Sequence, residues 1–145
     1  MNPIIITTKP VNGVIEIPLG NICKCQIGLV SIELPNIERD EVDDNYHEIN
    51  ISCDQIDSNM SNRKRLLRRI CMEKHRNLYT SIEFKTILYF PVDSADKKLT
   101  IRIKDEYGPV VIRDRVSRKS NPQTVTLTLN VIPKDGAGEQ WIRYI

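Results

Sequence analysis

The chain has 145 residues, 40% hydrophobic and 28% charged, which suits one globular domain with a single core. Its formal net charge of +2 is too small to predict nucleic-acid binding by itself, and aromatic residues, at 6%, are too scarce for a row of base-stacking platforms. No apolar run approaches the roughly 20 residues of a membrane span, so we expect no membrane contact. The start of the sequence lacks the features of a secretory signal, which predicts a protein kept inside a cell or inside a particle assembled there.

Short strands separated by turn residues are predicted for the first part of the chain. Residues 3–10 are a candidate strand closed by a proline, and 12–18 form a second strand between glycine and proline. Residues 25–34 alternate apolar and polar side chains at first, and the phase is then less clean. The acidic stretch "NIERDEVDDNY" predicts a surface loop, after which 46–53 resumes the alternation. The apolar side of that strand consists of Ile49, Ile51 and Cys53.

The segment "RKRLLRRICMEK" is ambiguous between helix and strand. Its apolar residues repeat at helical spacing, and Ser61 or Asn62 can cap a helix start, so the pattern predicts a short helix. A strand of about five residues over "RRICM" is the alternative, and the spacing alone does not decide between the two for residues 63–73. The apolar residues in question are Leu66, Leu67, Ile70 and Cys71.

Strands also dominate the remaining part of the chain. Residues 82–91 are apolar on both sides near their end, which predicts a central strand. Residues 98–104 and 109–113 read as a hairpin that turns at Glu106-Tyr107-Gly108. Residues 123–132 alternate almost without a fault, as expected of a strand with one buried face. That face consists of Val125, Leu127, Leu129 and Val131.

These elements predict an all-β protein. Eight or nine short strands with at most one short helix fit a β-sandwich or barrel, and the lack of alternating strands and long helices excludes a parallel α/β sheet. The sequence shows no repeat, no low-complexity tract and no second domain. We therefore expect residues 1–145 to form one domain.

Chemistry-bearing residues form no recognisable constellation. The two histidines, His47 and His75, make no His-x-His pair, and each reads as a solvated surface residue. Cys71 and His75 would share a face of a helix, but a buried thiol beside an exposed ring explains them better than a catalytic pair does. "GAG" lacks the residues of a phosphate loop, and the acidic stretch lacks EF-hand spacing. We expect no catalytic, cofactor-binding or metal-binding residues, no cofactor, and no enzymatic activity.

The four cysteines predict free thiols. Cys23 and Cys25 are two apart, and the sequence has no C-x-x-C pair, so a zinc site is not indicated. Cys53 and Cys71 each stand alone and read as small buried hydrophobic residues.

Two basic clusters stand out from the small net charge. The first has three possible interpretations: the solvated face of a helix, a contact with nucleic acid or an acidic partner, and a nuclear-localisation signal. The second lies in the loop before the last strand. Two such clusters would suit the inner rim of an assembly that packages a genome. The clusters are Arg63, Lys64, Arg65, Arg68 and Arg69, and then Arg113, Arg115, Arg118 and Lys119.

Four stretches carry a resemblance to a known group. They are "NGVIEIPLGNICKCQIGLVSIELPNI", "LLRRI", "YFPVDSADKKLTIRIKDEYGPVV" and "VTLTLNV". From about residue 12 to 132 the chain resembles the jelly-roll capsid proteins of Maverick/Polinton-type elements, adintoviruses and virophages. The resemblance implies a single jelly-roll β-sandwich of two antiparallel four-stranded sheets, with strands B, I, D and G in one and C, H, E and F in the other. The strands B to I would be 12–18, 25–34, 46–53, 67–73, 82–91, 98–104, 109–113 and 123–132.

The resemblance also implies a structural function. Major capsid proteins of the group have two jelly rolls, whereas this chain has room for one, which implies a penton-like or minor capsid protein or a domesticated relative. We expect a closed homo-oligomer, with a pentamer favoured over a trimer, and other capsid proteins as further partners. The expected location is the virion, or the cytoplasm or nucleus for a domesticated relative. The alternative is an intracellular β-sandwich that binds a protein or carbohydrate, for which Trp141 and Tyr144 would supply an aromatic patch.

Overall fold

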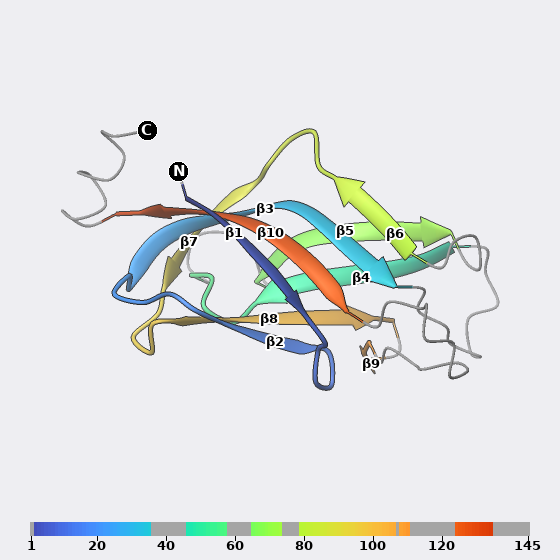
Figure 1. Ribbon diagram of the computed structural model, residues 1–145, viewed down its shortest axis with the longest axis horizontal. Coiled ribbons are helices and arrows are strands. Elements are labelled where there is room, and N and C mark those ends of the chain that lie inside the picture. Colours follow the sequence, from blue (N-terminus) through green and yellow to red (C-terminus); the bar gives the residue numbers. More distant parts are fainter. Residues whose placement is uncertain are drawn as a thin grey trace.

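The computed structural model describes residues 2–35, 46–57, 65–73, 79–106, 108–110 and 124–134. The regular structure of these residues is entirely β: ten strands form two antiparallel sheets (Figure 1). The first sheet contains β1 (Asn2–Thr8), β10 (Val125–Pro133), β3 (Lys24–Pro35), β6 (Tyr79–Glu83) and β7 (Tyr89–Asp93). The second contains β2 (Val14–Pro18), β8 (Lys98–Asp105), β4 (Tyr46–Cys53), β5 (Leu66–Glu73) and β9 (Gly108–Pro109).

The strand order is that of a jelly roll. One sheet runs β1-β10-β3 and then β6 with β7, and the other runs β2-β8-β4-β5. If β6 and β7 are counted as one position and the two-residue β9 is left out, the first strand pairs with the last, the second with the next to last, and so inward to β4 and β5. These are the B-I-D-G and C-H-E-F sheets of a jelly-roll sandwich, so the predicted fold class is confirmed.

Two details of the expected topology are wrong. Among the described residues each sheet has four positions but five strands, because β6 and β7 share one position beside β3, and β9 pairs with the end of β8. The expected strand letters B to G are displaced by one: β1 takes position B, and the segment expected there, β2, takes position C, whereas the last strand takes position I as expected. The displacement arises because the resemblance begins at about residue 12 and leaves out β1.

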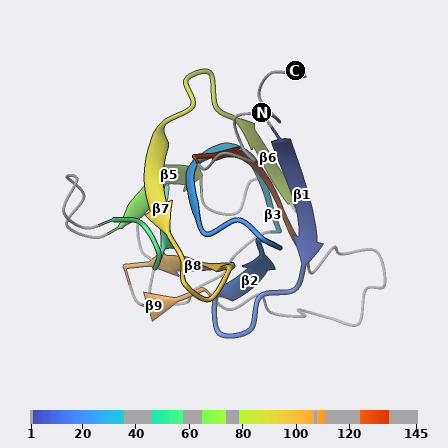
Figure 2. The same cartoon turned by 90° about the vertical axis from the view of Figure 1, so that its left-hand side faces the viewer.

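The core lies between the two sheets and is almost entirely aliphatic. Figure 1 shows β10 and β3 above β8 and β2, and Figure 2 shows the same arrangement from the side. The apolar faces predicted for β10 and β4 are both confirmed, since every residue named for them is fully buried. The largest fully buried side chains are Ile17, Ile27, Leu29, Ile32, Leu34, Ile49, Ile51, Leu67, Leu99, Ile101, Ile103 and Leu127.

A β-bulge explains why the alternation in β3 loses its phase. Thr128 of β10 lies opposite Ser31, whereas the next residue, Leu129, lies opposite Leu29, so Val30 is an extra residue on β3. One extra residue reverses the side to which the following side chains point. Leu29 and Ile32 therefore both face the core, although they are three positions apart.

A second bulge accounts for the incorrect helix prediction at residues 63–73. Ile51 and Ser52 of β4 lie opposite Arg68 and Leu66, so Leu67 is the extra residue on β5. Leu67 and Ile70 are both buried, and the bulge gives them the three-residue spacing that resembles a helical period. The segment is therefore a strand from Leu66 to Glu73, longer than the alternative strand over "RRICM".

The segment 82–91 is not one central strand. It is divided between β6 and β7, whose one neighbouring strand in the described structure is β3, so the two form an edge of the sheet; beyond that edge β7 makes only an isolated bridge, between Val92 and Ile56. Its second apolar side comes from Ile87 and Tyr89, which pack over Gly28 on the outer face of the sheet.

The predicted hairpin after β8 is confirmed, in shorter form. Asp105 pairs with Gly108, and the returning strand β9 ends at Pro109. Residues 111–113 of the expected strand, and the acidic loop after Pro35, lie outside the described residues.

Candidate functional site

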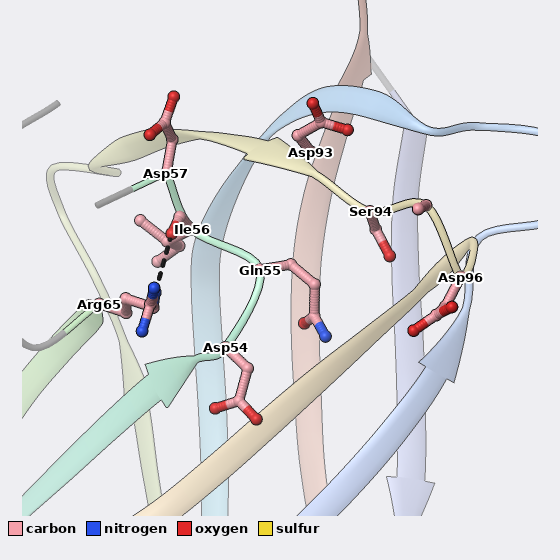
Figure 3. Close-up of a pocket in the computed structure, with 9 residues that line it drawn as sticks. Asp54, Gln55, Ile56, Asp57, Arg65, Asp93, Ser94 and Asp96 are labelled. Carbon is pink, nitrogen blue, oxygen red and sulfur yellow. Dashed lines mark hydrogen bonds between the residues drawn. The ribbon is translucent and has the colours of Figure 1, made fainter. Parts of the chain in front are cut away.

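A hollow of about 610 Å³ lies at one end of the sandwich (Figure 3). Two segments far apart in the sequence form it: residues 54–57, which follow β4, and residues 93–96, at the end of β7 and in its connection to β8. Arg65, directly before β5, completes the lining. Four aspartates make the hollow acidic: Asp54, Asp57, Asp93 and Asp96.

Side-chain hydrogen bonds to the backbone hold both connections in place. The buried hydroxyl of Ser94 donates to the Lys98 carbonyl at 2.7 Å and accepts from the Lys98 N–H at 3.2 Å. Gln55 accepts from the Thr100 N–H at 2.7 Å and donates to the Thr100 hydroxyl at 3.2 Å. The hollow is therefore a fixed feature of the fold, but the polar groups of Ser94 and Gln55 are engaged within the protein.

The charged groups do not converge on one point. Asp54 forms a two-pronged ion pair with Arg102, in which Nε–Oδ1 and Nη2–Oδ2 are both 2.9 Å, and this hydrogen bonding raises the pKa of Arg102. Arg65 donates from Nε to the Ile56 carbonyl at 3.2 Å. In Figure 3 the carboxylates of Asp57 and Asp93 point away from that of Asp54.

The chemistry of this arrangement is that of exposed carboxylates, which can bind cationic groups. The described residues contain no group of three or more His, Cys, Asp or Glu side chains able to hold a metal ion. A nucleophile needs a base within hydrogen-bond reach, and the one hydroxyl in the described lining, that of Ser94, is bonded to the backbone. Exposed carboxylates at a rim can instead pair with lysine or arginine side chains of a partner.

Sequence reasoning did not predict this site. Its first half reads as the end of a strand, "HEINISCDQI", and its second half as a polar turn, "DSADKK", and no local signal says that they meet. The isolated β-bridge between Ile56 and Val92 and the hydrogen bond from Asp57 N–H to the Pro91 carbonyl, 3.0 Å, bring them together.

The predicted thiol environments are half right. Cys53 is buried, and its burial raises the pKa of the thiol from 9.0 to about 11, so it is a poor nucleophile. Cys71 is exposed, contrary to expectation, because Ile70 takes the inward position of β5. Cys25 is buried and Cys23 half-buried, and none of the four forms a disulfide.

The two histidines are not brought into a described site. His47 pairs with Met72 in the β4–β5 ladder. His75 lies outside the described residues, so the pairing of Cys71 with His75 stays untested.

The described arginines of the first basic cluster make contacts within the protein. Arg68 lies opposite the buried Ile51; its guanidinium is 4.2 Å from the centre of the Phe84 ring and donates to the Thr86 carbonyl at 3.0 Å. Arg68 thereby links the edges of the two sheets. Arg69 pairs with Glu48 at 3.1 Å on the outer face. Arg63 and Lys64 of the first cluster lie outside the described residues, and so do all four residues of the second cluster.

The strand order thus defines the class as a jelly-roll β-sandwich. Comparison of the chain with protein-family models, with curated proteins and with solved structures finds no match in any of the three. In the described part of the chain, no helix is long and apolar enough to cross a membrane.

Proposed function

We propose that this chain is a structural protein whose single jelly roll assembles with copies of itself into a ring-like capsomer. It would act as a penton-like or minor capsid protein, or as a capsid-derived relative. The observation that carries the proposal is the strand order, β1-β10-β3-β6/β7 against β2-β8-β4-β5. This fold recurs in viral capsids, lectins and cupins, and a cupin-type metal centre generally takes several histidines where this sequence has two.

The two faces of each sheet differ in what they contact, and this difference supports a structural role. Both inner faces are used for the aliphatic core, which leaves outer faces and loops for neighbours. The outer face of β2-β8-β4-β5 carries cross-strand ion pairs, Lys98–Glu16 at 3.3 Å and Arg69–Glu48 at 3.1 Å. Such exposed pairs add little stability but give a surface a charge pattern that a partner can match.

The sequence after β10 supplies an apolar contact for assembly. Residues 135–145 lie outside the described structure and end in "WIRYI", with Trp141 and Tyr144 as aromatic residues of the kind that interfaces favour. Burial of this tip against a neighbour would remove an exposed apolar patch. A single jelly roll suits a fivefold vertex, so a pentamer is favoured over a trimer. Other capsid proteins would adjoin it in the virion, and the cluster at Arg113–Lys119 would face the genome.

Removal of residues 139–145 tests the proposal. Light scattering of the full-length chain at tens of micromolar should give a closed oligomer, and the truncated chain should give a smaller mass. A monomeric full-length chain would contradict the assembly. A ring that survives the truncation would contradict only the role of Trp141 and Tyr144.

A binding module is the second candidate, and the acidic hollow favours it. Its described lining has no aromatic side chain for stacking on a sugar, so a protein partner with lysine or arginine side chains fits better than a carbohydrate. A monomeric chain should then bind a lysine-rich peptide, and Asp93→Asn with Asp96→Asn should weaken binding at least about tenfold. Glu83→Gln, an exposed carboxylate on β6, is the matched control. Equal losses in both variants would point to non-specific charge attraction and contradict the site.

A further inference from the structure

The outer edge of β1 is an open strand edge. In the described structure β1 pairs with β10 alone, and its other side continues neither sheet; Figure 2 shows β1 along the right-hand side of the molecule. The strand has seven residues, "NPIIITT", without a charged side chain, and its register with β10 is unbroken. Ile5, at its centre, is 68% exposed.

The other three edges of the described sheets carry features that discourage pairing. The edge opposite β1 is interrupted between β6 and β7 over residues 84–88. The β2 edge is short, carries the exposed Glu16 and ends at Pro18. The β5 edge contains the bulge at Leu67 and the exposed Arg69. Charges, prolines, bulges and short strands are the usual protections of an edge, and β1 has only the proline at position 3, near its start.

We propose that β1 pairs antiparallel with β1 of a second copy across a two-fold axis, so that one sheet continues through both molecules. In an antiparallel ladder every second residue directs both its N–H and its C=O to the same neighbour, so two identical edges satisfy each other. An axis at Ile5 would place Ile5 opposite Ile5 of the second copy, and Ile4 opposite Ile6.

The charge and shape of this edge favour a second copy as the occupant. A two-fold axis brings like residues together, so a charged residue near the axis would meet its own charge, and β1 has none. Beneath the edge lies a groove of about 460 Å³ whose apolar lining includes Ile6, Val11 and Val14, with Val11 72% exposed. Pairing would bring Ile4 of the second copy beside Ile6 and cover this groove.

This pairing is independent of the proposed capsomer. A ring is built from head-to-tail contacts between different surfaces, whereas the β1 contact joins the same surface of two copies. It would give a dimer by itself or join two rings into one particle.

Ile5→Lys tests the pairing, because it places two like charges at the axis. Ser81→Lys is the matched control, an exposed position on the outer face of β6 at the opposite edge of the same sheet. Sedimentation at tens of micromolar should show that Ile5→Lys halves the mass of the full-length chain and that Ser81→Lys leaves it unchanged. Circular dichroism should show the same strand content in both variants, since neither side chain is buried.

Cross-linking supplies a second readout. With Cys23 and Cys71 changed to serine, Ile5→Cys should form an intermolecular disulfide under mild oxidation, and Ser81→Cys should not. A ring whose mass Ile5→Lys leaves unchanged would overturn the pairing and leave the capsomer proposal standing. A dimer that Ile5→Lys dissociates would support the pairing and contradict the capsomer. A monomeric full-length chain would overturn both.

Discussion

Gly28→Ala perturbs a specific packing arrangement on the outer face of the first sheet. Gly28 of β3 lies directly opposite Tyr89 of β7, whose ring covers the space that a side chain at position 28 would fill. A Cβ added there would lie 2.6 Å from Cγ2 of Ile87 and 2.8 Å from Cε1 of Tyr89. The Tyr89 hydroxyl accepts a hydrogen bond of 3.1 Å from Nδ2 of Asn130, a buried amide. The new methyl group must therefore displace both neighbours and weaken this bond.

The expected cost follows from three contributions. Overpacking of this kind costs about 1–3 kcal/mol. Loss of the Asn130–Tyr89 hydrogen bond costs about 0.5–1.5 kcal/mol. Alanine is better than glycine in a strand interior by about 0.5–1 kcal/mol, which offsets part of the loss. These contributions sum to about 0.5–4 kcal/mol, so Gly28→Ala should lower the free energy of unfolding by roughly 2 kcal/mol.

Urea unfolding followed by circular dichroism measures this loss. As a control, the same substitution is measured in the double variant Ile87→Ala with Tyr89→Ala. This background lacks the side chains that the new methyl group meets. In that background Gly28→Ala should be neutral or slightly stabilising. If Gly28→Ala leaves the unmodified chain as stable as before, Tyr89 does not lie over Gly28, and the register of β7 on β3 is wrong.

The remaining predictions concern the core and the thiols. Leu127→Ala, at a fully buried position of β10, should lower the free energy of unfolding by about 2–5 kcal/mol. Thr126→Ala should cost less than about 1 kcal/mol, because its 2.9 Å hydrogen bond to another threonine is exposed; equal losses would mean that the strand phase is wrong. Under denaturing conditions without reductant, a thiol titration should detect all four cysteines, and iodoacetamide should modify Cys71 first in the folded protein; a native disulfide would contradict free thiols. Because burial raises the pKa of Cys53 to about 11, its neutral thiol stabilises the fold fully below pH 9, and up to about 3 kcal/mol should be lost between about pH 9 and 11. Cys53→Ala should remove that part of the pH dependence, and an unchanged slope would contradict the shift.

The sequence predicts a strand and its buried face wherever apolar and polar residues alternate within that strand. The inner face of β10 follows directly from its period of two, because every second residue is aliphatic and the next is usually threonine. The bulges at Val30 and Leu67 were not predictable in this way. An extra residue is defined only against the partner strand, and the partners β10 and β4 are far away in the sequence. A bulge also imitates helical spacing, which explains the incorrect prediction for β5.

The acidic hollow lies beyond sequence reasoning for a similar reason. Asp54 follows β4 and Asp93 ends β7, far apart in the sequence, and only the topology brings these two segments together. The inward position of Arg68 was equally hidden, since five basic residues among the seven at 63–69 left open a solvated helix face, a contact with nucleic acid or an acidic partner, and a nuclear-localisation signal. Its contact with Phe84 depends on the edges of the two sheets meeting.

The mass of the full-length chain at physiological salt tests the central claim most directly. Sedimentation equilibrium at tens of micromolar should give a discrete closed oligomer with five copies per ring favoured over three, as one ring or as two rings joined through β1. A monomer of 16.7 kDa under these conditions would contradict the proposal that this jelly roll is a self-assembling structural protein.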